Sequence, residues 1–231
     1  VDDASGDGSL DILREYREKG VILIELPEHR GISYACNAAL SKAQGEIVIR
    51  TDADTIVPSN WISSFLRYFE DKEIIAVGGA TYGCLNHNVR IARANCMFVK
   101  IGERLFNRPS IFGRLPGANR AIRKSALLAA GGFSEEYVRS EDIDLFLRLR
   151  KQGKIIFDPD IVIETDFPQT LRALWRRKFL GGECESAKLR ILPSVRTTFS
   201  FFIAFSSAGF LVLFLFSLFF NRVAAAHFLI L

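Results

Sequence analysis

Two acidic residues one position apart are the first candidates for chemistry in this sequence. Asp52 and Asp54 lie in the run 51–55, directly after the strand-like segment 46–50. Two carboxylates this close at the end of a buried strand repel each other unless a positive charge lies near them. Carboxylate oxygens suit Mg2+ or Mn2+, ions that usually share their coordination shell with substrate phosphates. We therefore predict a divalent-metal site at Asp52 and Asp54; the alternative is a turn with two solvated acids.

A second acidic group opens a predicted helix that runs to residue 152. Glu141, Asp142 and Asp144 follow Ser140, which we expect to be the N-cap. A carboxylate that stays ionised at a helix start can take the proton from an attacking hydroxyl, so we interpret this group as a general base. The alternative is that these acids only interact with the helix dipole.

Two glycine-containing loops are further candidates for ligand binding. In the run 2–9, Asp2 and Asp3 precede glycines that let the backbone turn tightly near a ligand. A carboxylate there can accept the imide proton of a uracil or guanine base; the alternative is an ordinary Gly-Asp turn. We expect Ser9 to cap the helix that follows. In the run 115–121, a glycine before a polar Asn-Arg pair indicates close approach of a ligand to the backbone; the alternative is an ordinary loop, with a helix C-cap at the later Gly-Gly pair.

The elements that must position these loops alternate between helical and strand-like patterns. Helices are predicted over 10–17, 33–42 and 60–69, and strands over 21–24, 46–50 and 74–77. This alternation predicts right-handed crossovers and a parallel-rich sheet with helices on both faces. Ligands of such sheets bind beyond the carboxyl ends of the strands. The acidic loops are therefore expected in one site.

A long uncharged segment lies near the end of the chain. Residues 197–220 contain no charged side chain and are numerous enough to cross a bilayer as a helix, although a buried core helix is the alternative. Residues 223–231 are apolar again and are predicted to begin a second span. Basic residues concentrate before the first span. We call the part of the chain at 181–196 the juxtamembrane segment. By the positive-inside rule, this charge predicts a cell-membrane protein whose catalytic domain is cytoplasmic.

Charge and cysteine content narrow the class of protein further. The net charge is +4, but no nucleic-acid recognition module is present, so we expect no nucleic-acid partner. None of the four cysteines has zinc-ligand spacing to a histidine, which predicts free thiols in a reducing compartment. The sequence begins Val-Asp-Asp, and we expect a fragment that lacks an opening strand and helix.

Taken in order, these motifs resemble glycosyltransferase family 2. The match runs from Val-Asp-Asp-Ala-Ser-Gly-Asp-Gly-Ser through Thr-Asp-Ala-Asp-Thr and Gly-Ala-Asn-Arg to Ser-Glu-Asp-Ile-Asp-Leu, over residues 1–180. The resemblance implies the GT-A fold, a Rossmann-like α/β sheet with helices on both faces, here without its first strand and followed by a transmembrane helix. It also implies inverting transfer of a sugar from a nucleotide-diphosphate donor to a glycan or lipid-linked acceptor, with Mg2+ or Mn2+ as cofactor.

The resemblance also implies roles for individual residues. Asp142 would be the catalytic base, with Glu141 beside it. Asp52 and Asp54 would hold the metal, and Asp52 also the donor. The remaining donor-binding positions carried over from the family motifs, or expected to reach the diphosphate, are Asp2, Asp3, Gly117, Asn119, Arg120 and Arg177.

The sequence departs from the family pattern at several positions. Cys36 stands where an arginine often precedes Asn37, and His29 where an asparagine is often found. The run 164–171 resembles the approach to the Gln-x-x-Arg-Trp motif of processive polysaccharide synthases, but the motif's tryptophan is missing; Trp175 is interpreted as an interfacial anchor. Arg177 belongs to a basic triplet that either reaches the diphosphate or is juxtamembrane charge. We therefore predict a non-processive enzyme; the alternatives are a processive synthase with a degenerate motif and a non-catalytic nucleotide-sugar-binding protein.

Overall fold

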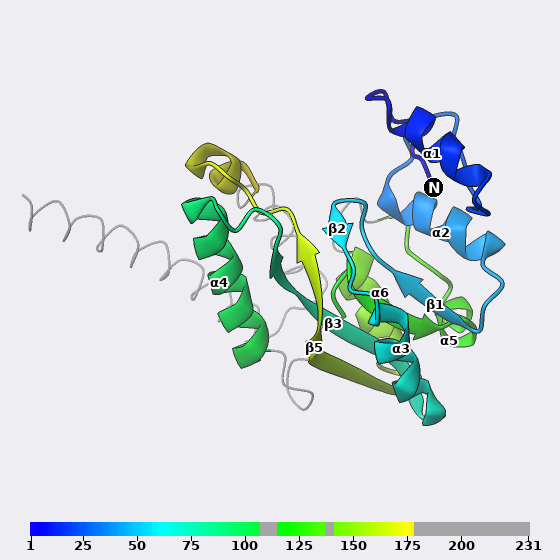
Figure 1. Cartoon of the computed structure of the whole chain (residues 1–231). Helices are drawn as coiled ribbons and strands as arrows, with labels where there is room; N and C mark the ends of the chain where they lie inside the picture. Colours follow the sequence, from blue (N-terminus) through cyan, green and yellow to red (C-terminus); the bar gives the residue numbers. More distant parts are fainter. Residues whose placement is uncertain (107–114, 137–140, 178–231) are drawn as a thin grey trace, which may run out of the picture. The chain divides into compact units, whose positions relative to one another are not determined.

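A mixed β-sheet forms the centre of the computed structural model, which describes residues 1–106, 115–136 and 141–177 (Figure 1). The strand order in the described part is β1-β4-β3-β5-β2. The strands are β1 (Ile47–Arg50), β2 (Thr55–Ile56), β3 (Ile74–Cys84), β4 (Arg120–Arg123) and β5 (Lys154–Thr165).

Helices flank this sheet. Several match the helical patterns of the sequence, but those over residues 90–106 and 124–129 were not predicted. The helices are α1 (Ser9–Arg17), α2 (Ile32–Lys42), α3 (Trp61–Leu66), α4 (Arg90–Phe106), α5 (Lys124–Ala129) and α6 (Glu141–Leu149). The predicted helices over 10–17 and 33–42 are confirmed as α1 and α2. The pattern over 60–69 is confirmed as α3, but its second half tightens into a 3-10 helix, η1 (Arg67–Glu70).

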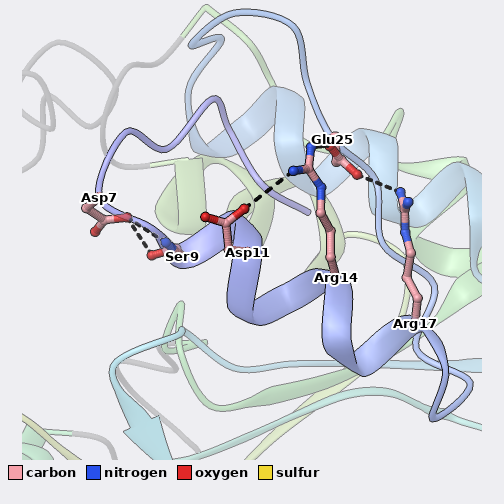
Figure 2. A network of polar contacts seen from close by, with 6 residues as sticks. All are labelled: Asp7, Ser9, Asp11, Arg14, Arg17 and Glu25. Atoms are coloured by element: carbon pink, nitrogen blue, oxygen red, sulfur yellow. Dashed lines mark hydrogen bonds and ion pairs between the residues drawn. The ribbon is translucent and has the colours of Figure 1, made fainter.

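The start of α1 differs from the prediction by one residue. Gly8, with φ 85°, is the N-cap, and Ser9 is already helical. The carboxylate of Asp7 accepts hydrogen bonds from the Ser9 amide and hydroxyl, at 3.1 and 2.6 Å (Figure 2). The cap prediction at Ser9 is therefore wrong, because glycine adopts the left-handed conformation of this turn without strain.

The prediction of a parallel-rich sheet is also wrong. Only β3 and β5 pair in parallel among the described strand pairs, while β1–β4, β3–β4 and β2–β5 are antiparallel. The physical reason is that β4 runs against both of its neighbours, and the two residues of β2 fold back on the end of β5. Strands of four and two residues leave too short a pattern to reveal their direction.

The apolar run 21–24 does not form the predicted buried strand. Next to this run, Glu25 forms an isolated parallel bridge with Asp2. Val21 and Ile22 are 47% and 65% exposed. A strand needs a partner along its length to bury its backbone groups, and among the described residues this segment has only that bridge.

Helices do lie on both faces of the sheet, as predicted. One core cluster contains Ile122 of β4 with Leu145 and Leu149 of α6, and another contains Ala121 of β4 with Phe65 of α3. Because adjacent strand residues point to opposite faces, these two clusters cover opposite sides of β4. The sheet is thus a rigid support for the loops at its strand ends.

Several sequence predictions fall outside the described residues. These are the N-cap at Ser140, the segment 181–196, and the apolar stretches 197–220 and 223–231. Within the ranges that the structure covers, no helix is both long and apolar enough to span a bilayer.

Candidate functional site

The acidic loop lies where the sequence predicted it, at the carboxyl end of β1. The Thr55 hydroxyl donates to the main-chain carbonyl of Asp52 at 2.7 Å and closes the loop as a turn. The Asp52 side chain is 41% exposed, and Asp54 is exposed as well. The fold therefore presents both carboxylates to solvent from the end of a central strand.

Arg50 links this loop to the start of α6. Its Nη2 atom lies 3.2 Å from an Asp52 carboxylate oxygen, and its Nη1 atom lies 3.5 Å from a Glu141 carboxylate oxygen. The side chains of Arg50 and Glu141 are 13% and 10% exposed, so the Arg50–Glu141 half of this bridge is largely shielded from water. It brings the two acidic groups of the sequence into one site. The sequence analysis did not select Arg50; the available signal was a charge at the last position of a strand-like segment.

Arg120 lies directly opposite Arg50 in the β1–β4 pairing. It is fully buried, and none of its guanidinium nitrogens has a hydrogen-bond partner among the described residues. Burial first, and the charge of Arg50 second, lower the pKa of Arg120 to about 10. The group therefore remains charged near neutral pH, and the nearby charges of Asp142 and Glu141 favour that charge.

Phe133 supports both guanidinium groups. Its ring centroid lies 5.9 Å from the Arg50 guanidinium carbon and 5.3 Å from that of Arg120. Asn37 fixes this residue, since its side-chain amide donates to the Phe133 carbonyl at 2.8 Å and accepts from the Phe133 amide at 2.9 Å. The adjacent Gly132, with φ 72°, belongs to the turn that ends α5. The Gly-Gly pair is thus a helix C-cap, the alternative noted from the sequence.

Cys36 faces the same two arginines. Burial raises the pKa of the Cys36 thiol, while the charges of Arg50 and Arg120 act against that rise. A third cation at this position would face both guanidinium groups, which gives a physical reason for the departure from the family pattern. Among the described residues, Cys36, Cys84 and Cys96 are all free thiols.

Asp142 lies in the first turn of α6, beside Gly117. A Cβ atom added at Gly117 would lie 4.0 Å from the Asp142 Cβ, so the glycine loop passes next to the predicted base. Asp144 has a different role, because it forms an ion pair of 2.6 Å with Arg148 on the same helix. Glu141 and Asp142 are therefore the acids of α6 that belong to the site.

Asn119 lies behind the site and ties strands together. It is fully buried. Its side-chain nitrogen donates to the carbonyls of Ala80 and Ile161, each at 2.8 Å, and its oxygen accepts from the Trp61 indole at 2.8 Å. A Cβ atom at Gly79 would lie 2.4 Å from the Asn119 nitrogen, so this position requires glycine. The hydrogen bonds of this amide hold β3, β5 and α3 in place.

Asp2 and Asp3 shape the loops at the amino-terminal side of α2. The Asp3 carboxylate accepts the backbone amides of Arg30 and Gly31 at 2.7 and 2.8 Å and pairs with His29 at 2.9 Å. The hydrogen bond from Arg30 is the main reason that the pKa of Asp3 is lowered. Asp2 is buried and accepts the Ser5 amide at 3.0 Å. Both carboxylates thus have protein partners in this structure.

Arg177 lies at a different place from the acidic site. It is exposed and donates to the Asp166 carbonyl at 3.4 Å. It lines a hollow of about 430 Å³ formed by residues 166–170, Ala173 and Arg177. None of the acids around Arg50 lines this hollow, so the described contacts do not bring Arg177 to them.

The acidic loop fits a divalent cation that shares its ligands with a substrate. The described residues contain no group of three or more metal-ligating side chains. Mg2+ needs only one or two carboxylates when water and substrate phosphates complete its octahedral shell. Asp52 and Asp54 supply such oxygen ligands and are open to solvent. The residues present are therefore compatible with Mg2+ or Mn2+ held together with a phosphate-bearing substrate.

Solved structures with a similar fold define the class of protein. A mannosyltransferase, PcManGT from Pyrobaculum calidifontis in complex with GDP-Man and Mn2+, aligns with a TM-score of 0.57 and 26% identity, over 76% of this chain and 49% of that one. Staphylococcus aureus TarS 1–349 in complex with UDP-GlcNAc aligns with a TM-score of 0.54, over 75% and 50% of the two chains; its 20% identity supports the fold alone. The chain has the GT-A fold of these glycosyltransferases.

A family model then gives the identification. The model for glycosyl transferase family 2 matches residues 1–129, and the chain belongs to this family. Similar curated proteins are a beta-monoglucosyldiacylglycerol synthase from Synechocystis, 29% identical over 77% of this chain, and a poly-beta-1,6-N-acetyl-D-glucosamine synthase from S. aureus, 26% identical over 77%. The chain spans 39% and 44% of their lengths. These relatives favour an enzyme over the non-catalytic binding protein considered from the sequence.

Proposed function

We propose that this enzyme transfers a sugar from a nucleotide-diphosphate donor to a lipid-linked, polysaccharide or other surface-glycan acceptor, with inversion at the anomeric carbon. The observation that carries the proposal is the bridge made by Arg50, which lies 3.2 Å from Asp52 and 3.5 Å from Glu141. Through this bridge, the solvent-exposed acids after β1 and the acids that open α6 form a single site. Donor binding at one group and proton removal at the other are then possible within one site.

Asp142 is the general base in this proposal. Its carboxylate takes the proton from the acceptor hydroxyl as that oxygen attacks the anomeric carbon and the bond to the diphosphate breaks. Attack from the face opposite the leaving group inverts the configuration. Glu141 is a positioning residue, because its ion pair with Arg50 fixes the start of α6 relative to the strand end.

Asp52 and Asp54 would hold Mg2+ or Mn2+ together with the donor. When bound, the ion supplies positive charge that offsets the charge of the departing diphosphate. This assignment is supported by the oxygen-only character of the loop. A related structure of the same fold was solved with GDP-Man and Mn2+.

The remaining residues proposed for donor binding have different roles. We assign the nucleotide base to Asp2 or Asp3, which shape the turn before α2. We assign the donor sugar or the acceptor to the loop at Gly117, which passes Asp142. Asn119 and Arg120 support this loop from the buried side. Arg177 is assigned to the diphosphate from the family resemblance, since no described contact brings it to the acids around Arg50.

The acceptor and the location are proposed from the relatives and the sequence. One similar protein is named as a glycolipid synthase and another as a synthase of a β-linked polysaccharide. These names support the proposal of a lipid-linked or polysaccharide acceptor for this chain. The apolar run 197–220 and the basic residues before it support a cell-membrane enzyme with its catalytic domain on the cytoplasmic side.

The test is a transfer assay on the full-length protein in membranes, with radiolabelled nucleotide sugars and Mn2+. Replacing the base by Asp142→Asn should lower turnover by roughly 10²–10⁴-fold. The matched control is Asp11→Asn on α1, whose side chain is 82% exposed. Turnover undiminished in Asp142→Asn would show that another group is the base.

A processive polysaccharide synthase is the second candidate function. It is favoured by the 26% identity to the poly-beta-1,6-N-acetyl-D-glucosamine synthase. The missing tryptophan of the processive motif favours a single transfer instead. The same assay separates the two, because single transfers give one product of fixed size, whereas a processive enzyme retains long products under limiting acceptor.

A further inference from the structure

Helix α4 has a well-defined inner face. Ala92 and Asn95 are buried, and Val99 packs against the small cluster of Ala80, Tyr82 and Phe157. The Cys96 thiol also donates to the Tyr82 carbonyl at 2.6 Å. These contacts fix the rotation of the helix beside β3 (Figure 1).

The outer face of α4 is apolar where a surface helix is normally polar. Met97 and Ile101 are 65% and 51% exposed. Met97 and Ile101 lie four residues apart and therefore on the same side of the helix. Surface helices of soluble domains normally carry polar residues on this side. The exposed apolar side chains therefore indicate a partner rather than ordinary solvation.

The charges around this apolar stripe have one sign. Arg90 and Arg93 are exposed on α4, and Arg93 lies four residues before Met97. Lys100 is exposed as well and lies at the edge of this face, with its ammonium nitrogen 5.3 Å from the centroid of the Tyr82 ring. The only acid in the helix sequence is Glu103. Its carboxylate is engaged by Thr81, through the backbone amide at 3.0 Å and the hydroxyl at 2.6 Å. The outer face thus combines exposed apolar side chains with exposed positive charge.

We propose that the outer face of α4, defined by Arg90, Arg93, Met97, Lys100 and Ile101, lies on the surface of a bilayer that contains anionic lipids. An interfacial helix buries its apolar face at the boundary between headgroups and acyl chains, while its basic residues contact anionic headgroups. The complementary charge selects this occupant over a neutral apolar protein groove. The contact goes beyond the proposed sugar transfer and does not depend on the donor, the acceptor or the apolar run 197–220.

A second surface with the same character is connected to the start of α4. Leu171 is 70% exposed, and Arg172 and Arg176 next to it are exposed as well. Asn86, just before α4, donates to the Asp166 carboxylate and to the Phe167 carbonyl, each at 2.6 Å. These hydrogen bonds connect the segment before Leu171 to the segment before α4. Two connected surfaces with exposed apolar and basic side chains support a membrane contact more strongly than one helix face alone.

The test uses the full chain reconstituted in vesicles, with tryptophan emission as the measurement of depth. Met97→Trp adds a fluorophore to the outer face of α4, and Ile12→Trp adds one to α1 at a position that is 60% exposed. The wild-type emission from Trp61 and Trp175 is subtracted. In 7:3 phosphatidylcholine:phosphatidylglycerol vesicles, brominated acyl chains should reduce the added emission of Met97→Trp at least twofold and leave that of Ile12→Trp unchanged.

Charge is tested in the same background. Adding Arg90→Ser, Arg93→Ser and Lys100→Ser to Met97→Trp should remove at least half of this quenching, as should pure phosphatidylcholine vesicles. Equal quenching of Met97→Trp and Ile12→Trp would overturn the proposal. Protection of the added emission from aqueous acrylamide without bromine quenching would also overturn it, because protein would then cover the face.

Transfer activity in detergent separates this proposal from the proposed function. The α4 variants should turn over donor at the wild-type rate when no bilayer is present. A protein that shows bromine quenching but no transfer would contradict the function and leave the membrane contact standing.

Discussion

Arg50 and Arg120 lie directly opposite each other at the end of the β1–β4 pairing, and both guanidinium groups lie over the ring of Phe133. Like charges opposite each other on a sheet are destabilising. Arg50 is compensated by Asp52 and Glu141, whereas Arg120 has no hydrogen-bond partner among the described residues. Placing a buried cation beside a partly buried one on neighbouring strands costs stability, and the structure keeps this arrangement next to the carboxylates of the site.

Replacing Arg50 should damage catalysis more than any substitution of an exposed arginine. Arg50→Met removes the bridge between Asp52 and Glu141, so the acids of the site lose their common support. We expect transfer to fall by about 10²-fold, the scale of a misplaced catalytic group. The measurement is kcat and KM for the donor in detergent.

The control for Arg50 is Arg14→Met on α1. Arg14 and Arg17 both pair with Glu25, at 2.8 and 2.7 Å, on an exposed surface (Figure 2). Exposed ion pairs contribute little to stability. Arg14→Met should leave both kcat and Tm close to wild type, and an equal loss in the two variants would contradict the assignment of Arg50.

Replacing Arg120 should raise the stability of the protein and lower its activity. Arg120→Met exchanges a buried, unpaired cation for an apolar side chain of similar length and relieves its repulsion with Arg50. Such exchanges are often neutral or stabilising, by about 1–4 kcal/mol. We expect the free energy of urea unfolding to rise while kcat falls. Destabilisation comparable to a core cavity would indicate that Arg120 is paired in the working enzyme.

Replacing Asn119 should have the opposite effect to replacing Arg120: stability should fall while donor binding is kept. Asn119→Ala leaves the Trp61 indole and the carbonyls of Ala80 and Ile161 without their partner. Each unsatisfied buried group costs about 1–3 kcal/mol. Chemical denaturation should therefore show a loss of several kcal/mol, with KM for the donor unchanged in the folded fraction. A raised KM without destabilisation would instead support direct contact with the donor.

Acid should weaken the protein in part through Asp3. Its pKa is lowered in the folded state, chiefly by the hydrogen bond from the Arg30 amide. A lowered folded-state pKa stabilises the protein above the unfolded value, 3.8, and this contribution is lost as pH falls through the folded value. The stability difference between wild type and Asp3→Asn should shrink as the pH falls below ~5. A difference that grows on acidification would contradict this assignment.

Substitutions of Asp52 and Asp54 should both change the Mn2+ requirement for transfer but differ in their effect on Tm. Chelation should abolish transfer, and Mn2+ should restore it. Asp54→Asn should raise the Mn2+ concentration needed for half-maximal transfer and leave Tm unchanged, because Asp54 is exposed. Asp52→Asn should do the same but also lower Tm, since it removes a partner of the buried Arg50. Full activity of Asp54→Asn at low Mn2+ would exclude it as a ligand.

Several helices and the acidic motifs could be predicted from the sequence because each is encoded locally, but α4 and α5 were not predicted. Periodicity placed α1 and α2, and the strand before Asp52 placed the acidic loop. The direction of β4 could not be predicted, because four residues carry no signal of their partner. The Arg50–Arg120 relationship depends on that register and was therefore missed. Asn119 shows a related limit, since a polar residue that ties strands together has the same sequence appearance as one that faces a ligand.

The Arg50–Asp52 contact also has a consequence for handling the enzyme. Part of the charge of the acidic loop is already neutralised by the protein's own arginine. The loop should therefore keep its conformation when purification buffers contain a chelator. Preparations stripped of divalent ions should remain folded, store well and regain activity on simple addition of Mn2+.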